Sequence, residues 1–160
     1  MLFQQVRIGR YGVPFVIYKL RTIPVGATQP TAWGRFLRST KLDELPQLVN
    51  LLKGDMALVG PRPDVPGYAD LLQGEDRILL SLKPGITGLA SLKYRNEEAL
   101  LSQHDAPLLY NDTVIWPDKV RINVWYARHR TFWMDLKILF YTFFPFSFDV
   151  DLYISNYKDS

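Results

Sequence analysis

Two adjacent carboxylates are the side chains in this sequence best suited to chemistry. Asp43 and Glu44 lie near the expected start of a helix, where the helix dipole stabilises negative charge. An ionised carboxylate there can act as a nucleophile or bind a metal ion. The spacing also allows a purely structural role, in which Asp43 is the capping-box partner of Thr40 and Glu44 is a solvated surface residue.

Several cations near restricted backbone favour an anionic substrate. Lys19 and Arg21 share one face of an expected strand, and Arg62 lies between two prolines. The planar arginine fork matches phosphate oxygens, and flanking prolines limit backbone freedom. The pattern predicts a pocket for a nucleotide diphosphate, and the alternative is scattered surface charge. The candidate cations are Lys19, Arg21, Arg35, Arg38 and Arg62.

A third feature is the mixture of basic and aromatic side chains over residues 119–133, followed by an aromatic stretch at 132–148. This composition suits an anionic membrane surface, and it also suits single-stranded nucleic acid. Asp135, Lys137 and Pro145 argue against a membrane-spanning helix here. The alternative is a C-terminal core helix with one charged face, on which His129 is structural.

Composition excludes several other kinds of site. The chain has no cysteine and two histidines, so a disulfide framework, a thiolate zinc site and a cysteine nucleophile are excluded. Neither the glycine-rich nucleotide-binding motifs nor the serine hydrolase motif occurs. The formal net charge of +3 and the pI of about 9.1 suit an anionic ligand or membrane.

The elements that must position these residues are mostly helical. We expect an α+β fold dominated by helices, with a small N-terminal β-hairpin, short strands and a C-terminal amphipathic interfacial helix. Residues 1–160 are expected to form one catalytic domain. The expected strands cover residues 3–22 as a hairpin, 56–59 and 89–94. The expected helices cover 31–37, 40–52, 66–81, 97–103 capped by Asn96, and 119–143 capped by Asp118 and ended by Pro145.

Four ordered motifs carry a family resemblance. They read FVIYKLRT at 15–22, LDELPQL at 42–48 after Arg38, KGDMALVGPRP at 53–63 and PGITG at 84–88, with DLKIL following at 135–139. The chain resembles the bacterial sugar transferases, the monotopic polyprenyl-phosphate phosphoglycosyl transferases, from Phe3 to about Thr142. Family members carry an apolar N-terminal membrane segment before this region, and we expect it to be lacking here.

The resemblance implies transfer of a sugar 1-phosphate from a nucleoside-diphosphate sugar, with UDP expected, to polyprenol (undecaprenyl) phosphate. It implies that Asp43 is the nucleophile of a covalent phosphosugar intermediate and Glu44 its catalytic partner, with Mg²⁺ bound at Glu44 and Asp43. Lys19, Arg21, Arg38 and Arg62 are then the cations that bind substrate phosphates. The reaction would start a surface polysaccharide or glycoconjugate at the cytoplasmic face of the bacterial inner membrane, on a peripheral or monotopic protein.

Four positions depart from the family pattern. Lys41 replaces a common serine and Asn123 a common aspartate, and Ala57 and Ser91 replace residues that are often Ser and Gln. The alternative function is a basic module without catalysis that binds a membrane surface or nucleic acid. The catalytic interpretation expects no nucleic-acid partner. The sequence leaves the sugar, the polymer and the oligomeric state open.

Overall fold

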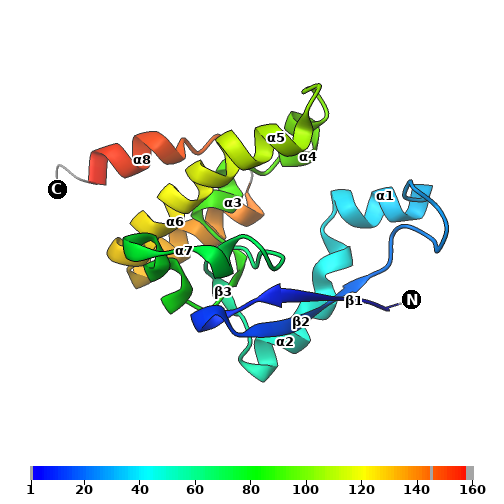
Figure 1. The fold of residues 1–160 in the computed structure, drawn as a ribbon, viewed down its shortest axis with the longest axis horizontal. Coiled ribbons are helices and arrows are strands. Elements are labelled where there is room, and N and C mark those ends of the chain that lie inside the picture. The colour runs from blue at the N-terminus through cyan, green and yellow to red at the C-terminus, as the bar shows by residue number, and fades with distance from the viewer. Residues whose placement is uncertain (1, 145, 158–160) are drawn as a thin grey trace.

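The computed structural model describes residues 2–144 and 146–157 (Figure 1). Strands β1 (Leu2–Ile8) and β2 (Pro14–Leu20) pair antiparallel across the short 3-10 turn η1 (Arg10–Gly12). In this register Phe3 lies opposite Lys19, and Arg7 lies opposite Phe15. The predicted N-terminal hairpin is therefore confirmed.

The segment that carries the two carboxylates differs from the prediction. Helix α1 (Ala32–Ser39) begins as expected, with the Thr31 side chain accepting a hydrogen bond from Gly34 N. Thr40 ends α1 rather than opening a new helix, because its hydroxyl donates to the carbonyls of Phe36 and Leu37. Lys41 then adopts a left-handed conformation, with φ of 58°.

After Lys41 the chain forms the 3-10 helix η2 (Leu42–Gln47) and then the α-helix α2 (Leu48–Lys53). The prediction of one continuous helix over 40–52 is therefore wrong. Pro46 lies inside η2, where its missing N–H and rigid ring disfavour a regular α-helix.

Two short parallel strands support the Pro-Arg-Pro turn. Strand β3 (Ala57–Val59) pairs with β4 (Gly85–Thr87). The prediction of a strand at 89–94 is wrong. Those residues form α3 (Leu89–Lys93), with consecutive Leu89 and Ala90 both buried. The strand that does form, β4, precedes the predicted one, because glycines let the two backbones approach closely. A Cβ at Gly85 would lie 2.1 Å from Gly60 N.

The middle of the chain is less regular than predicted. Instead of one helix over 66–81 there are two 3-10 helices, η3 (Ala69–Leu71) and η4 (Gly74–Ser81), because the backbone between them is extended at Leu72 and Gln73. Helix α4 (Glu97–Leu101) is present as expected, but the Asn96 side chain makes no capping hydrogen bond. Two short segments follow, α5 (Pro107–Tyr110) and the π-helix η5 (Asn111–Ile115).

The long C-terminal helix is divided. Helix α6 (Trp116–His129) ends where Arg130 adopts a non-helical ψ of 135°, and α7 (Phe132–Phe143) starts with the Thr131 side chain accepting from Met134 N. Asp118 lies inside the first turn of α6, so its predicted capping role is wrong. Pro145 lies outside the described residues. A further helix, α8 (Val150–Tyr157), was not predicted.

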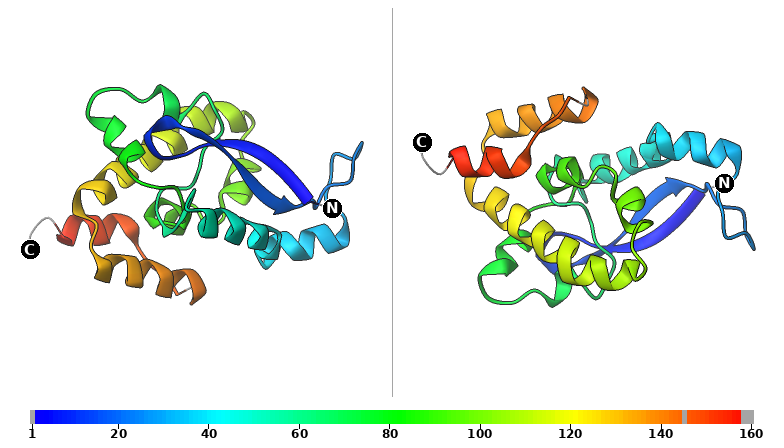
Figure 2. Two further views of the ribbon diagram at one scale, coloured as in Figure 1. Left: turned by 90° about the horizontal axis from the view of Figure 1, so that it is seen from below. Right: turned by 90° about the horizontal axis from the view of Figure 1, so that it is seen from above.

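Helix α6 lies between two parts of the hydrophobic core. Ile122, Trp125 and Tyr126 pack in one cluster, which includes residues of α3, α7 and α8. Val120 and Val124 pack in the other, with residues of β1, η3 and η4. Helix α1 lies at one end of the molecule and α8 at the opposite end, and the hairpin runs from the α1 end towards the middle (Figures 1 and 2). The fold confirms the predicted helix-dominated α+β class, and none of the described helices is long and apolar enough to cross a membrane.

Candidate active site

A buried asparagine holds the carboxylate segment against the hairpin. Asn50 of α2 is fully buried, and its amide donates to Val16 O at 2.7 Å and accepts from Tyr18 N at 3.3 Å. These bonds attach α2 to strand β2, and η2 immediately precedes α2 in the chain. Lys19, the next residue of β2, consequently reaches Glu44 of η2.

Glu44 is shared by two cations. Its Oε1 accepts hydrogen bonds from Lys19 Nζ at 2.9 Å and from Arg62 Nη2 at 2.5 Å, and its side chain is 11% exposed. Burial alone would raise the pKa of Glu44, but the charges of Arg62 and Lys19 outweigh it and lower this pKa to about 2. Glu44 is therefore ionised at neutral pH and fixes two cations in one place.

Asp43 is adjacent in the chain but differs in its surroundings. The residue is 9% exposed, and within the described part of the chain its Oδ1 has no hydrogen-bond partner. Burial, and then the charge of Glu44, raise the pKa of Asp43, whereas Lys19 and Lys41 oppose this shift. The capping-box interpretation is wrong, because Thr40 N donates to Phe36 O in α1.

The other predicted cations lie elsewhere. The Arg21 guanidinium stacks 5.5 Å from the centre of the Phe3 ring, and Arg38 donates to Thr22 Oγ1 at 3.0 Å. Arg35 donates to the Pro30 carbonyl. Across residues 2–144 and 146–157, hydrogen bonds and ion pairs join Lys19 and Arg62 to Glu44 of the adjacent Asp43–Glu44 pair (the dyad), but they do not join Arg21, Arg35 or Arg38 to it. The structure therefore brings together four of the predicted site residues.

Comparison with known proteins agrees with the motifs at this site. A family model described as bacterial sugar transferase matches residues 1–148. The chain belongs to this family. One relative is an uncharacterized sugar transferase, EpsL, of Bacillus subtilis (strain 168), which is 38% identical over 149 residues. That match covers 87% of this chain and 66% of the relative.

Two further relatives in the bacterial sugar transferase family have names that state an activity. A UDP-glucose:undecaprenyl-phosphate glucose-1-phosphate transferase of Klebsiella pneumoniae is 36% identical over 161 residues, covering 90% of this chain and 32% of the relative. An undecaprenyl-phosphate galactose phosphotransferase of Salmonella typhimurium is 34% identical over 168 residues, covering 88% of this chain and 32% of the relative. The chain thus spans about a third of the length of these two relatives.

Two charged residues beside this candidate site were not predicted from the sequence. Arg7 Nη1 donates to Pro63 O at 3.2 Å, beside Arg62. Asp64 follows the turn, and burial raises its pKa to about 6 although Lys119, Arg7 and Arg62 oppose the shift. The alternation of side chains along β1 could have predicted Arg7. Arg7 lies on the same face of the strand as Phe3, and Phe3 is the cross-strand partner of Lys19.

The dyad offers oxygen ligands of the type that Mg²⁺ prefers. No cluster of three or more His, Cys, Asp or Glu side chains able to hold a metal occurs in the described part of the family domain. Glu44 Oε1 accepts hydrogen bonds from two cations, whereas Asp43 Oδ1 has no hydrogen-bond partner among the residues that the structure describes. These residues fit an ion that takes one or two carboxylates and completes its coordination with substrate phosphates and water.

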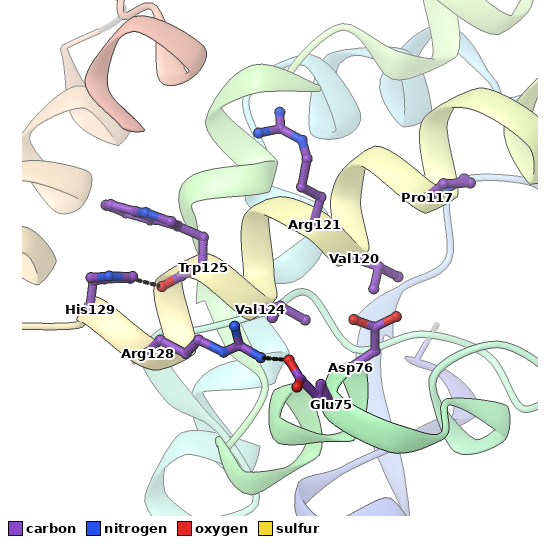
Figure 3. Close-up of a pocket in the computed structure, with 9 residues that line it drawn as sticks. All are labelled: Glu75, Asp76, Pro117, Val120, Arg121, Val124, Trp125, Arg128 and His129. Atoms are coloured by element: carbon purple, nitrogen blue, oxygen red, sulfur yellow. Dashed lines mark hydrogen bonds and ion pairs between the residues drawn. The ribbon is translucent and has the colours of Figure 1, made fainter. Parts of the chain in front are cut away.

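A separate groove of about 420 Å³ lies between η4 and α6 (Figure 3). Arg128 crosses it to Glu75 at 2.7 Å, and His129 Nδ1 bonds to the carbonyl of Trp125 at 2.8 Å, in agreement with the structural role expected for this histidine. The groove is lined by neither the dyad nor any of its cations. The groove and the dyad are therefore separate features of the structure.

Proposed function

We propose that this chain is a phosphoglycosyl transferase catalytic domain, extending over residues 1–160. It transfers a sugar 1-phosphate from a nucleoside-diphosphate sugar, with UDP expected, to polyprenol (undecaprenyl) phosphate. The names of the Klebsiella and Salmonella relatives support this activity. The structural observation that carries the proposal is the contrast between the two carboxylates. Asp43 Oδ1 has no hydrogen-bond partner over residues 2–144 and 146–157, whereas the adjacent Glu44 holds two cations.

In the proposed reaction Asp43 is the nucleophile. A carboxylate oxygen of Asp43 forms a bond to the phosphorus that carries the sugar, and the bond from that phosphorus to the bridging oxygen breaks. The nucleoside monophosphate leaves with the bonding electron pair. A phosphate oxygen of the polyprenol phosphate then attacks the same phosphorus, which frees the Asp43 carboxylate and forms the polyprenyl-diphosphate sugar.

Lys19 and Arg62 stabilise the charge that develops on the diphosphate. Glu44 already orients both cations, so little reorganisation is needed when the donor binds. Arg62 uses Nη2 for Glu44, and its other N–H groups remain able to meet phosphate oxygens. Arg21 and Arg38 are also proposed to bind substrate phosphates, but they do not contact Glu44. Arg21 lies against the Phe3 ring, and Arg38 contacts Thr22 and Glu98.

We propose Mg²⁺ as the cofactor, bound by the carboxylates of Asp43 and Glu44. When bound, it would neutralise negative charge on the diphosphate oxygens. The oxygen chemistry of the dyad and the unpartnered Oδ1 of Asp43 support this assignment.

We also propose that the domain lies on the anionic cytoplasmic surface of the bacterial inner membrane, as a peripheral or monotopic protein, and starts a surface polysaccharide there. The exposed aromatic side chains of α7 and the following residues support this location. Burying them in lipid is favourable by about 25 cal/mol per Å² of apolar surface. They are Phe132, Trp133, Phe140, Phe143, Phe144 and Phe146.

A donor screen tests the proposed function. The purified chain is incubated with Mg²⁺ and either UDP-glucose or UDP-galactose, with and without undecaprenyl phosphate, and UMP release is measured. We expect release limited to about one equivalent without the acceptor and continued turnover with it. Binding to lipid vesicles or nucleic acid, with no UMP released from any donor, would instead support the non-catalytic module.

A further inference from the structure

The turn that carries Arg62 is held at three backbone carbonyls. Pro61 O accepts from Gly85 N at 2.7 Å, and Asp64 O accepts from Ile8 N at 2.9 Å. Between them, Pro63 O accepts from the Arg7 side chain at 3.2 Å. Two consecutive residues of β1 therefore hold the backbone immediately after Arg62.

Arg7 occupies an unfavourable place for a cation. It is half-buried, its Nε is buried and has no hydrogen-bond partner among the described residues, and Nη2 donates to Gln5 Oε1 at 2.7 Å. Burial and the charge of Arg62 both lower the pKa of Arg7, whereas Asp64 and Glu44 oppose this. A second guanidinium beside Arg62 costs electrostatic energy that a neutral donor to Pro63 O would avoid.

We propose that Arg7 is a positioning residue for Arg62, and this inference rests on the proposed function. By fixing the Pro63 carbonyl, Arg7 sets the direction in which Arg62 leaves the turn and reaches Glu44. The charges of Asp64, the residue after Pro63, and of Glu44 oppose the lowering of the pKa of Arg7 by burial and by Arg62.

The hairpin thereby controls both cations of the dyad. Lys19 of β2 contacts Glu44 directly, and Arg7 of β1 acts on Arg62 through Pro63. Strands β1 and β2 pair in one register, so the two hairpin residues that act on these cations, Lys19 and Arg7, belong to one paired unit. A misplacement of about 1 Å at a reacting group can cost about 10²-fold in rate.

The test compares Arg7→Gln with Arg10→Gln. Arg10 is a matched control, because it also lies in the hairpin and also donates to a backbone carbonyl, Ser81 O, at 2.7 Å. We expect Arg7→Gln to lower kcat/KM for the UDP-sugar donor by about 10²-fold and Arg10→Gln by less than about twofold. Arg7→Lys keeps one donor for Pro63 O, so we expect partial recovery.

A double-mutant cycle separates positioning from an independent role. In an Arg62→Ala background, Arg7→Gln should lower kcat/KM by less than about twofold further, since the residue it positions is absent. A full and additive loss in that background would overturn the proposal.

A second measurement needs no substrate. The ¹H–¹⁵N signal of Arg62 Nε is recorded in the wild type, Arg7→Gln and Arg10→Gln, and we expect it to move only in Arg7→Gln. A lower melting temperature of Arg7→Gln with an unmoved Arg62 signal would show a purely structural role and overturn the proposal. If the wild type released no UMP, the proposed function would fail, while this measurement would still decide how Arg7 acts on Arg62.

Discussion

Glu44 Oε1 accepts hydrogen bonds from two cations, whereas Oδ1 of the adjacent Asp43 accepts none within the described residues. Neighbouring residues on a helical segment point in different directions, so the two carboxylates enter different surroundings. The carboxylate of Asp43 is therefore able to react, whereas the carboxylate of Glu44 orients the two cations.

Replacing the proposed nucleophile should abolish turnover and leave the fold intact. We expect Asp43→Asn to lose at least about 10³-fold in turnover and to form no phosphosugar adduct with donor and Mg²⁺, as measured by intact-protein mass spectrometry. The melting temperature should change little, because Oδ1 of Asp43 makes no hydrogen bond within the described part of the chain that an amide would break. The exposed Asp76→Asn is the control and should form the adduct normally. An adduct that persists in Asp43→Asn would place the nucleophile at another residue.

The ion pairs of Glu44 should appear in the pH dependence of stability. Because the pKa of Glu44 is lowered from 4.5 to about 2, its contribution is complete above about pH 4.5 and is lost as the pH falls towards 2. This pKa shift corresponds to about 3 kcal/mol in the free energy of unfolding, lost between about pH 4.5 and pH 2. Glu44→Gln should lack this part of the loss, as measured by urea unfolding at several pH values. The solvent-exposed Glu98→Gln should retain the wild-type slope, and an equal slope in Glu44→Gln would contradict the assignment.

Arg62 should not be replaceable by lysine. We expect Arg62→Ala to lower kcat/KM for the donor by about 10²-fold, and Arg62→Lys not to restore it, because one ammonium cannot bind Glu44 and phosphate with the arginine geometry. Arg77→Lys is the control, since exposed Arg77 donates only to the Leu72 carbonyl among the described residues. Wild-type activity in Arg62→Lys would contradict the proposal that the guanidinium binds Glu44 and a substrate phosphate at the same time.

Membrane binding should depend on the exposed face of α7. Trp133 and Phe143 are each 76% exposed, so Trp133→Glu with Phe143→Glu should weaken co-sedimentation with anionic vesicles while preserving the fold. Binding should also weaken as salt is raised, because charge attraction contributes. Val25→Glu, at an exposed loop position, is the control and should bind like the wild type. No binding of the wild type at low salt would contradict this prediction.

Local sequence patterns were sufficient for several features of this protein. Alternating strand residues around a glycine-containing turn predicted the hairpin, and Thr31 before α1 marked a real helix start. The adjacency of Asp43 and Glu44 and the rigid Pro-Arg-Pro turn also identified the dyad and one of its cations. These features depend on interactions between residues close in the chain, and short-range periodicity and turn chemistry describe such interactions well.

Contacts between distant segments decided the rest. Lys19 meets Glu44 across 25 positions of sequence and Arg7 meets Pro63 across 56, and no spacing rule predicts either contact. The strand at Gly85–Thr87 forms because β3 is available to pair with it, although its own residues read as a loop. Likewise, the break between α6 and α7 follows from the non-helical backbone of Arg130 and from the packing of both helices into one core cluster. Side-chain pairing in three dimensions, and not residue type, therefore determined which of the predicted arginines lies at the candidate active site, because electrostatic interaction and burial depend on distance in space and not on distance along the chain.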